Sequence, residues 1–416
     1  MRFIADFHLH SKYSRATSKD MEVETLARWA KKKGISLLGT GDFTHPTYFA
    51  ELRSKLEPSR NGLFRLKKED QGVHYLLTAE VSNIYSQGGR VRRIHTLIFA
   101  PDFKVAEAIR SKLGNRGKLS SDGRPIFGFP AKDLAKMILD ISSECLVVPA
   151  HAWTPWFSIF GANSGFDSIE ECFEEVSSYI HAIETGLSSD PEMNWRLSAL
   201  DRLTLLSNSD AHSPSRLGRE ANVFACELDY KEITETIRTK DRRRLLFTVE
   251  FFPEEGKYHY DGHRDCGVIF SPSQTKAHQY LCPVCHKRLT VGVARRVEEL
   301  SDRPEGFVPR NAIPSIHLIP LEEIIAEGLG YRVGTKAVET EYDRLVEMGG
   351  SEFGILLDAT PDDLASFVPQ KIREGILRMR QGKISIIPGH DGVYGKINLF
   401  PEKKEAEESK EQLKLF

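Results

Sequence analysis

Two histidines stand one residue apart near the start of the chain, where His8 and His10 directly follow the apolar segment 3–7. Side chains along a strand point alternately to its two faces, so both imidazoles lie on one side and can reach the same metal ion. Taken alone, such a pair is more often two surface histidines than a metal site. The acidic and histidine residues that follow decide between these interpretations.

Further potential metal ligands stand at or near the ends of later strand-like segments. They are Asp42, His45, Glu80, His95, His151, Asp210 and His212. Imidazole nitrogens and carboxylate oxygens suit Zn, Mn or Fe, and this set is large enough for two or three ions. Glu184 stands at a similar strand end and is a candidate ligand or a support for one.

The elements that must position these residues alternate along the first 250 residues. We expect strands at 3–7, 36–40, 74–82, 94–100, 146–149, 182–184, 204–207 and 222–227, with helices between them such as 23–33 and 131–142. This alternation indicates an α/β fold with a parallel sheet or barrel. In a closed barrel the strand ends share one face, so distant residues would converge there.

A second constellation lies further along the chain. His263 and Cys266 form one pair with two residues between them, Cys282 and Cys285 form another, and fifteen residues separate the two pairs. This spacing predicts one tetrahedral structural zinc site, for which His259 and His286 are rival ligands. With four protein ligands, such a zinc has no open position for catalysis.

Composition indicates an intracellular protein with several domains. The chain has 416 residues, 40% hydrophobic residues, a formal charge of −2 and six cysteines. The thinly spread cysteines suit a reducing cytoplasm, and no apolar run is long enough for a membrane span. We expect a metal-binding barrel at 1–250, a zinc module at 251–300, a mainly helical region at 301–400 and a charged tail at 401–416. The expected helices of the third part are 321–329, 335–348, 360–366 and 369–381.

The first set of residues resembles the polymerase and histidinol phosphatase (PHP) superfamily, which has a distorted seven-stranded, (β/α)7-type barrel and hydrolyses phosphoesters. The resemblance covers about residues 1–250. It implies that His8, His10, Glu80 and Asp210 surround one metal, and that Glu80 bridges to a second held by His95 and His151. Asp42, His45 and His212 would build a third site, although the chain has Ser11 to Arg15 and Phe43 where the superfamily has further ligands. Two such metals can activate a water and neutralise phosphate oxygens.

The whole chain resembles endonuclease Q. The resemblance rests on the barrel, the zinc pairs and the segments 255–263, 297–306 and 388–395. It implies cleavage of double-stranded DNA on the 5′ side of hypoxanthine, uracil, xanthine and abasic sites, with Zn as cofactor and Mg or Mn as alternatives for activity. His8, His10, Glu80, His151, Asp210 and His212 would be the catalytic residues, in a cytoplasmic, nucleoid-associated enzyme.

Several residues are candidates for DNA contact. Arg90, Arg92 and Arg93 precede the candidate ligand His95 and could bind phosphates, although each basic cluster could also be a solvated surface. Trp153, Trp156 and Phe157 follow His151 and could form a wall or wedge for an extruded base, or pack in the core.

The C-terminal end and two other functions complete the predictions. Gln412, Leu415 and Phe416 resemble a shortened motif for binding a sliding clamp. The alternatives to a repair endonuclease are a small-molecule phosphoesterase of the histidinol-phosphatase type and a DNA-binding adaptor with a vestigial metal barrel. The zinc module counts against the first and the full ligand set against the second.

Overall fold

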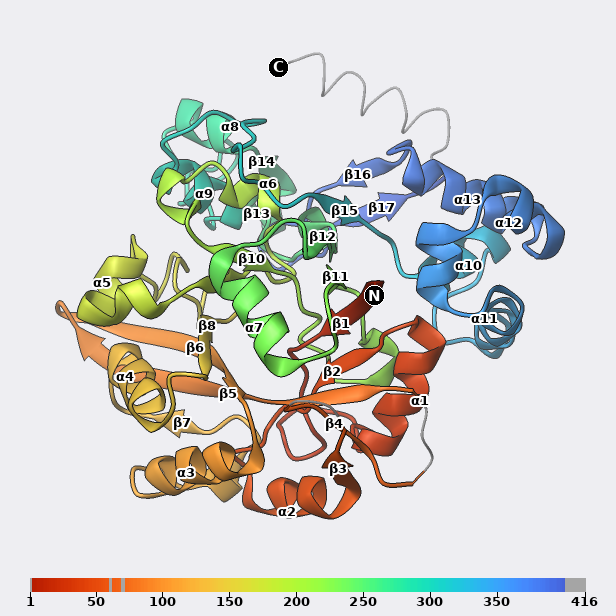
Figure 1. The fold of residues 1–416 in the computed structure, drawn as a ribbon. Coiled ribbons are helices and arrows are strands. Elements are labelled where there is room, and N and C mark those ends of the chain that lie inside the picture. Colours follow the sequence, from red (N-terminus) through yellow and green to blue (C-terminus); the bar gives the residue numbers. More distant parts are fainter. Residues whose placement is uncertain (1, 60–61, 69–71, 401–416) are drawn as a thin grey trace. The chain divides into compact units, whose positions relative to one another are not determined.

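The computed structural model describes residues 2–59, 62–68 and 72–400, and these form two compact units (Figure 1). The first unit takes in the described residues of 1–31, 35–250 and 291–316. The second takes in 32–34, 251–290 and the described residues from 317 onward. Among the described residues, no helix is both long enough and apolar enough to cross a membrane.

The first unit is built on a mixed sheet covered by helices. Its strands are β1 (Arg2–Asp6), β2 (Leu37–Gly39), β3 (Leu56–Pro58), β4 (Phe64–Leu66), β5 (His74–Gln87), β6 (Arg90–Ala100), β7 (Ile126–Phe127), β8 (Leu146–Pro149), β9 (Ala182–Glu184), β10 (Thr204–Leu206), β11 (Ala221–Ala225) and β12 (Leu245–Glu250). The sheet runs in the order β12-β11-β1-β2-β5-β4-β3, while β6 joins β5 to β8, and β9 pairs with β10 separately. All eight predicted strands are present, with ends that differ by a few residues.

Helices connect most of these strands. They are α1 (Val23–Lys33), α2 (Pro46–Lys55), α3 (Phe103–Gly114), α4 (Ala131–Ile141), α5 (Ile169–Phe173), α6 (Pro191–Asn194), α7 (Tyr230–Thr239) and α9 (Val293–Leu300). Helix α7 shows how sequence sets the bounds: the Asp229 carboxylate accepts hydrogen bonds from the backbone of Lys231 and Glu232, and Lys240 ends the helix in the left-handed conformation.

The expectation of a parallel sheet holds only in part. The β1–β2, β2–β5 and β9–β10 pairs are parallel, but β5–β6, β6–β8, β1–β11 and β11–β12 are antiparallel. The long hairpin of β5 and β6, orange in Figure 1, turns through Gly88 and Gly89, whose φ angles are 60° and 73°. Because two residues with positive φ make this turn, the strands need no crossover helix and run antiparallel.

An aromatic cluster in the core of the first unit packs around the residue that follows β1. Phe7, which follows β1, has its ring centroid 5.3 Å from that of Phe99 and 6.0 Å from that of Phe224. All three side chains are fully buried, and burying each contributes about 1.5–3 kcal/mol to the stability of the fold. This aromatic cluster fixes the chain directly before His8.

The second unit combines small hairpins with helices. Its elements are β13 (Asp261–His263), β14 (Val268–Phe270), α8 (Pro272–Ala277), α10 (Leu321–Leu329), α11 (Lys336–Gly349), α12 (Pro361–Phe367), α13 (Gln370–Arg380), β16 (Ser385–Ile387) and β17 (Lys396–Asn398). Helices α10 to α13 match the four helices predicted in this region. The buried Glu352 carboxylate accepts hydrogen bonds from the backbone of Leu321, at the start of α10, and from the Tyr342 hydroxyl.

Two segments of the second unit that are far apart in the sequence interlock through their backbones. Gly389 donates to the carbonyl of Glu254 (2.7 Å) and accepts from the amide of Tyr260 (2.9 Å), while Gly395 donates to Glu255 (3.1 Å). A Cβ on Gly395 would lie 2.1 Å from the Glu254 carbonyl oxygen, and one on Gly389 would meet neighbouring backbone at 2.3 Å. Close backbone approach therefore requires glycine at both positions.

We predict that Phe99→Ala lowers the free energy of unfolding of the first unit by about 3–5 kcal/mol, because it leaves a cavity in the aromatic core. Chemical denaturation followed by circular dichroism measures the change. Val91→Ala, on the same strand but 52% exposed, is the control and should shift stability by less than about 0.5 kcal/mol. Equal effects of the two substitutions would contradict the assignment of Phe99 to the core.

Candidate metal centre

The ends of several strands bring potential metal ligands of the first unit into two groups. In each group the ligand atoms lie within 4.8 Å of one another: His8, His10 and Asp210 form the first, and Glu80, His95 and His151 form the second. Apart from Asp210, whose side chain is 27% exposed, these residues are buried. The six therefore converge from positions up to two hundred residues apart in the sequence.

The Glu80 carboxylate joins the two groups. Its Oε2 lies 3.5 Å from His8 Nε2 and 3.3 Å from His10 Nε2. Its Oε1 lies 2.8 Å from His95 Nδ1 and 3.1 Å from His151 Nε2. Because one oxygen faces each group, the carboxylate has the arrangement of a ligand that bridges two ions.

A second partner orients each of three histidines toward the centre. The Nδ1 atom of His8 lies 2.9 Å from the Glu184 carboxylate, that of His10 lies 3.2 Å from the Asp42 carboxylate, and that of His151 lies 3.1 Å from the Thr154 hydroxyl. These contacts leave the Nε2 atoms for a metal, as is usual for metal-binding histidines. Among the described residues, buried His8 Nε2 has no hydrogen-bond partner, which fits the lone pair of a ligand. The residues present thus fit a metal centre.

Asp42 holds His10 in place and accepts several hydrogen bonds within the chain. Its Oδ2 accepts hydrogen bonds from the amide of Ser11 (2.6 Å), from the Ser11 hydroxyl (2.7 Å) and from the Ser14 hydroxyl (2.8 Å), while Oδ1 faces His10. These contacts let Asp42 orient His10, while metal binding by Asp42 itself stays a prediction.

The residues of the predicted third site lie less close together than those of the two groups, and a third metal stays a prediction. Within the described ranges, Asp42, His45 and His212 do not gather their ligand atoms within 4.8 Å. His45 instead caps α2 by accepting from the amide of Tyr48 (3.4 Å), and its ring stacks on Tyr13 at 4.4 Å. His212 donates from Nδ1 to the backbone oxygen of Asp210 (2.8 Å).

Burial and opposing charge set the protonation of the centre. Burial alone would raise the pKa of the Glu80 carboxyl, but the charges of His95 and Arg124 hold it well below its usual range. Burial lowers the pKa of His95 to about 4, despite the Glu80 carboxylate beside it. Burial opposes protonation of His8 too, but Glu184 and Glu80 outweigh it and raise the His8 pKa. A metal at His8 would therefore displace a proton and bind more tightly as pH rises.

Three residues of the centre have strained backbone conformations. The φ angles are 45° at Asp42, 30° at His151 and 46° at Asp210, in the region that L-residues rarely adopt. Such conformations cost about 1–3 kcal/mol each and persist where the surroundings impose them. At Gly186 a Cβ would lie 2.5 Å from the Cβ of His151, so this glycine makes room for the strained histidine.

Arg124 is a residue of the centre that the sequence patterns did not single out. Its Nη1 donates to Glu80 Oε2 at 3.0 Å, and this neighbouring carboxylate raises the pKa of the guanidinium. A lone arginine in a loop carries no spacing signal. The fold places it near Glu80, because it stands two residues before the start of β7, a strand that pairs with β5 two residues beyond Glu80.

The three candidate aromatic residues after His151 have different environments. Trp153 is buried, donates from Nε1 to Asn194 (2.8 Å) and therefore belongs to the core. Trp156 is 41% exposed. The Phe157 ring lies 4.7 Å from the ring of His95, at the edge of the second ligand group.

The three candidate arginines lie at the start of β6. Arg90 is exposed next to the hairpin turn. The guanidinium carbons of Arg92 and Arg93 lie 4.0 Å from the ring of Phe166 and 5.6 Å from that of Phe157, respectively. These cation–π contacts hold two positive charges on the strand that carries His95.

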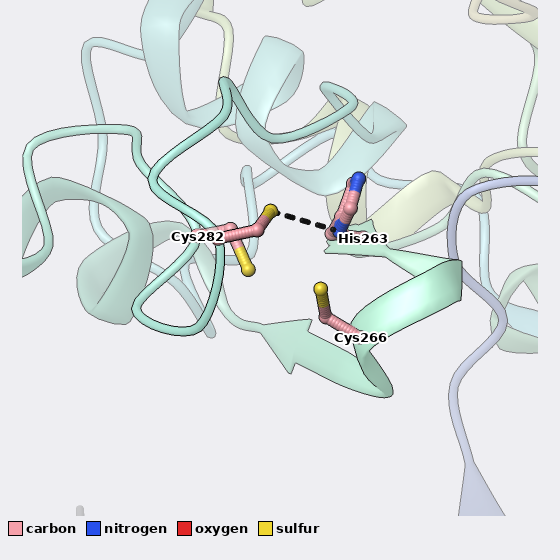
Figure 2. Close-up of side chains that lie close together, drawn as sticks. His263, Cys266 and Cys282 are labelled. Atoms are coloured by element: carbon pink, nitrogen blue, oxygen red, sulfur yellow. Dashed lines mark hydrogen bonds between the residues drawn. The ribbon is translucent and has the colours of Figure 1, made fainter.

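The zinc-site residues form one cluster in the second unit. His263, Cys266, Cys282 and Cys285 have ligand atoms within 4.8 Å of one another, and this group contains neither rival histidine. Figure 2 shows His263, Cys266 and Cys282 directed toward a common point. His263 Nδ1 lies 3.5 Å from Cys285 Sγ. Three sulfurs and one imidazole suit a closed tetrahedral zinc site.

We predict that Glu184→Gln weakens metal binding at the centre about 10- to 100-fold, because it removes the carboxylate that orients His8. Titration of the metal-stripped protein with Mn, followed by calorimetry, measures the affinity. Glu175→Gln, at an exposed position, should leave the affinity unchanged. Unchanged affinity in Glu184→Gln would show that His8 needs no carboxylate partner.

We also predict that Cys282→Ser releases one zinc ion per chain, because a serine hydroxyl is a poor substitute for a thiolate ligand. Metal analysis after dialysis gives the zinc content, and hydrogen exchange reports the protection of β13 and β14. Cys226→Ser, in the first unit, is the control and should retain the zinc. Full zinc content in Cys282→Ser would refute a zinc site at this cluster.

Comparison with known proteins gives matches along the chain. The family model for the MJ0043 C-terminal domain matches residues 320–383. The uncharacterized protein MJ0043 of Methanocaldococcus jannaschii is 35% identical over 263 residues, which are 61% of this chain but only 32% of that relative's length. The uncharacterized protein YqxK of Bacillus subtilis is 31% identical over 414 residues, 95% of this chain and 99% of that protein.

Two solved structures match nearly the full length. The lesion-specific endonuclease PfuEndoQ from Pyrococcus furiosus has a TM-score of 0.85 and 32% identity, covering 98% of this chain and 99% of its own. Endonuclease Q in complex with a 27-mer duplex substrate, with an abasic lesion at the active site, has a TM-score of 0.84 and 33% identity, covering 97% and 98%. With this identity over nearly the full length of both chains, the protein belongs to the endonuclease Q family.

Proposed function

We propose that the protein is a metal-dependent DNA repair endonuclease. It hydrolyses the phosphodiester bond on the 5′ side of hypoxanthine, uracil, xanthine and abasic sites in duplex DNA. The observation that carries this proposal is the Glu80 carboxylate, which turns one oxygen to each ligand group in a chain that matches endonuclease Q bound to a lesion-containing duplex.

The proposed scaffold of the centre is a distorted (β/α)7 barrel of the PHP type. Backbone contacts support its closure: the amide of Ala152, after β8, donates to Glu184 of β9 (2.9 Å). Strand β9 pairs with β10, and beyond β10 Ala211 pairs with Leu9 and accepts from the amide of His10 (3.0 Å). These links connect β8 to the end of β1 through the β9–β10 pair.

The residues of the centre have separate roles in this proposal. His8, His10 and Asp210 would hold one divalent ion, His95 and His151 a second, and Glu80 both. Divalent ions in such a site lower the pKa of a bound water and offset the charge of a phosphate; Zn, Mg and Mn are the candidates. Burial favours the neutral form of His212 by lowering its pKa, and Nδ1 donates to a carbonyl, so Nε2 can accept a proton from water.

Parts outside the centre would bind the duplex. Arg90, Arg92 and Arg93 extend from the strand of His95, where positive charges would contact phosphates and make binding sensitive to salt. The exposed ring of Trp156 is the best placed of the three candidate aromatics to stack on a base.

The remaining divisions of the chain stay as predicted. We assign 1–250 to the metal-binding barrel, 251–300 to a structural zinc module and 301–400 to a mainly helical DNA-binding region. The candidate clamp-binding residues Gln412, Leu415 and Phe416 lie outside the described residues, and clamp binding stays a prediction.

We predict that Asp210→Asn slows nicking by more than about 100-fold, since loss of a mere supporting carboxylate already costs 10- to 100-fold. DNA affinity should stay within about threefold, because phosphate contacts by cations supply most of it. End-labelled duplexes with one inosine, uracil or tetrahydrofuran abasic site, incubated with Mg, Mn or Zn, measure nicking, and fluorescence anisotropy measures binding.

Asp140→Asn, at an exposed position, is the matched control and should nick normally. Equal loss of binding and nicking in Asp210→Asn would indicate a folding role instead. Rapid hydrolysis of small phosphate esters without nicking of any lesion duplex would favour a small-molecule phosphoesterase and end the repair assignment.

A further inference from the structure

Arg124 places a positive charge beside the bridging carboxylate of the metal centre. Its Nη1 lies 3.0 Å from Glu80 Oε2, and within the described part of the chain Glu80 is the only side chain that accepts a hydrogen bond from it. The Glu80 side chain is 1% exposed, whereas that of Arg124 is 26% exposed. The guanidinium therefore spans from the buried carboxylate to solvent, and has N–H groups left to donate.

Hydrogen bonds hold the loop that carries Arg124 on both sides of this residue, at Asp122 and at Pro125. Asp122 Oδ1 accepts from the backbone amides of Arg124 (3.1 Å) and Arg15 (3.3 Å). On the other side, the amide of Ser82 donates to the carbonyl of Pro125 (3.0 Å). Ser82 lies two residues beyond Glu80 on β5, so the same strand carries the bridging carboxylate and holds the loop of Arg124.

Gly123 lets this loop pack directly against the groups that orient His10. A Cβ at Gly123 would lie 2.3 Å from Asp42 Oδ2 and 2.3 Å from Ser14 Oγ. The Gly123 amide also donates to the carbonyl of Tyr13 (3.0 Å). Since only glycine allows this approach, the loop is built to bring the residue after it, Arg124, to the centre.

We propose that Arg124 binds the phosphate of the cleaved linkage and stabilises the charge that the phosphate gains during hydrolysis. In that reaction a water oxygen bonds to phosphorus, one bridging P–O bond breaks, and the leaving oxygen takes up the proton that the water gave up. The phosphate gains negative charge along the way, and a guanidinium fork beside it offers two parallel hydrogen bonds. The inference rests on the proposed DNA-cleaving function.

A purely structural role makes different predictions. If Arg124 only offsets the charge of Glu80, its removal changes metal affinity and stability but not the interaction with one particular phosphate. The test is therefore a double-mutant cycle in which one change removes Arg124 and the other removes the negative charge of the phosphate at the cleavage site. The cleavage site is first located by letting the wild-type protein nick a duplex with a tetrahydrofuran abasic site.

Binding is measured by anisotropy with full-length protein carrying Asp210→Asn, so that the DNA stays intact. A neutral methylphosphonate at the mapped linkage should weaken binding about 10-fold when Arg124 is present, as expected for a hydrogen bond to a charged group. With Arg124→Ala the same change should weaken binding less than about twofold. Arg116→Ala, at an exposed position, should retain the full effect of the methylphosphonate.

Nicking is measured with otherwise unaltered protein. Arg124→Ala should slow single-turnover nicking about 100-fold or more, and Arg116→Ala should not. Arg124→Lys keeps a charge next to Glu80 and guards against a folding defect; it should melt like the wild type and still nick about 10-fold more slowly or worse.

The inference is overturned if the methylphosphonate effect is the same with and without Arg124, or if Arg124→Lys nicks at the wild-type rate. Either result leaves the proposed function standing. Failure of the wild-type protein itself to nick any lesion duplex would instead reject the proposed function.

Discussion

The burial of one carboxylate governs the architecture of the first unit. An ion with 1% exposure is costly unless opposite charges and donors surround it, and Glu80 has four imidazoles and a guanidinium around its two oxygens. Those groups come from four separate parts of the chain, so the fold must bring all of them to one point. Removing any of them takes a hydrogen-bond donor or an opposite charge away from the buried carboxylate.

The sequence alone predicted many of the strands and most of the residues that meet at the two sites. Apolar runs predicted eight strands of the first unit, because buried strands are marked by continuous apolar residues. The spacing of His8 and His10, with the later histidines and carboxylates, predicted a metal centre, and the resemblance to the PHP superfamily implied the two groups whose residues lie together in the structure. The meeting of His263 and Cys266 with Cys282 and Cys285 was predicted too, since two short pairs of this kind have few other uses, while zinc binding itself stays a prediction.

The rest depends on contacts that no local pattern contains. The antiparallel pairing of β5 and β6 follows from the turn at Gly88 and Gly89, whereas the general alternation of strands and helices favoured parallel strands. Strand β12 was not predicted, because it forms by pairing with β11, a contact that the local sequence does not reveal. Arg124 reaches Glu80 only through the support of β5 and a glycine beside it. The contacts of Asp42 with His10, Ser11 and Ser14 likewise arise from the fold and have no signal in the sequence.

The interlocked backbone of the second unit has a consequence for biogenesis. The ribosome releases the zinc-ligand segment long before Gly389 and Gly395, the glycines that pair with Glu254, Glu255 and Tyr260, have been made. About 100 residues separate Cys285 from Gly389, which takes roughly 5–20 s to translate. During that interval the nascent module lacks its backbone partner and has only a very small apolar cluster around Cys282. Binding of zinc during translation would then protect the nascent module from proteolysis until the segment with Gly389 and Gly395 has been made.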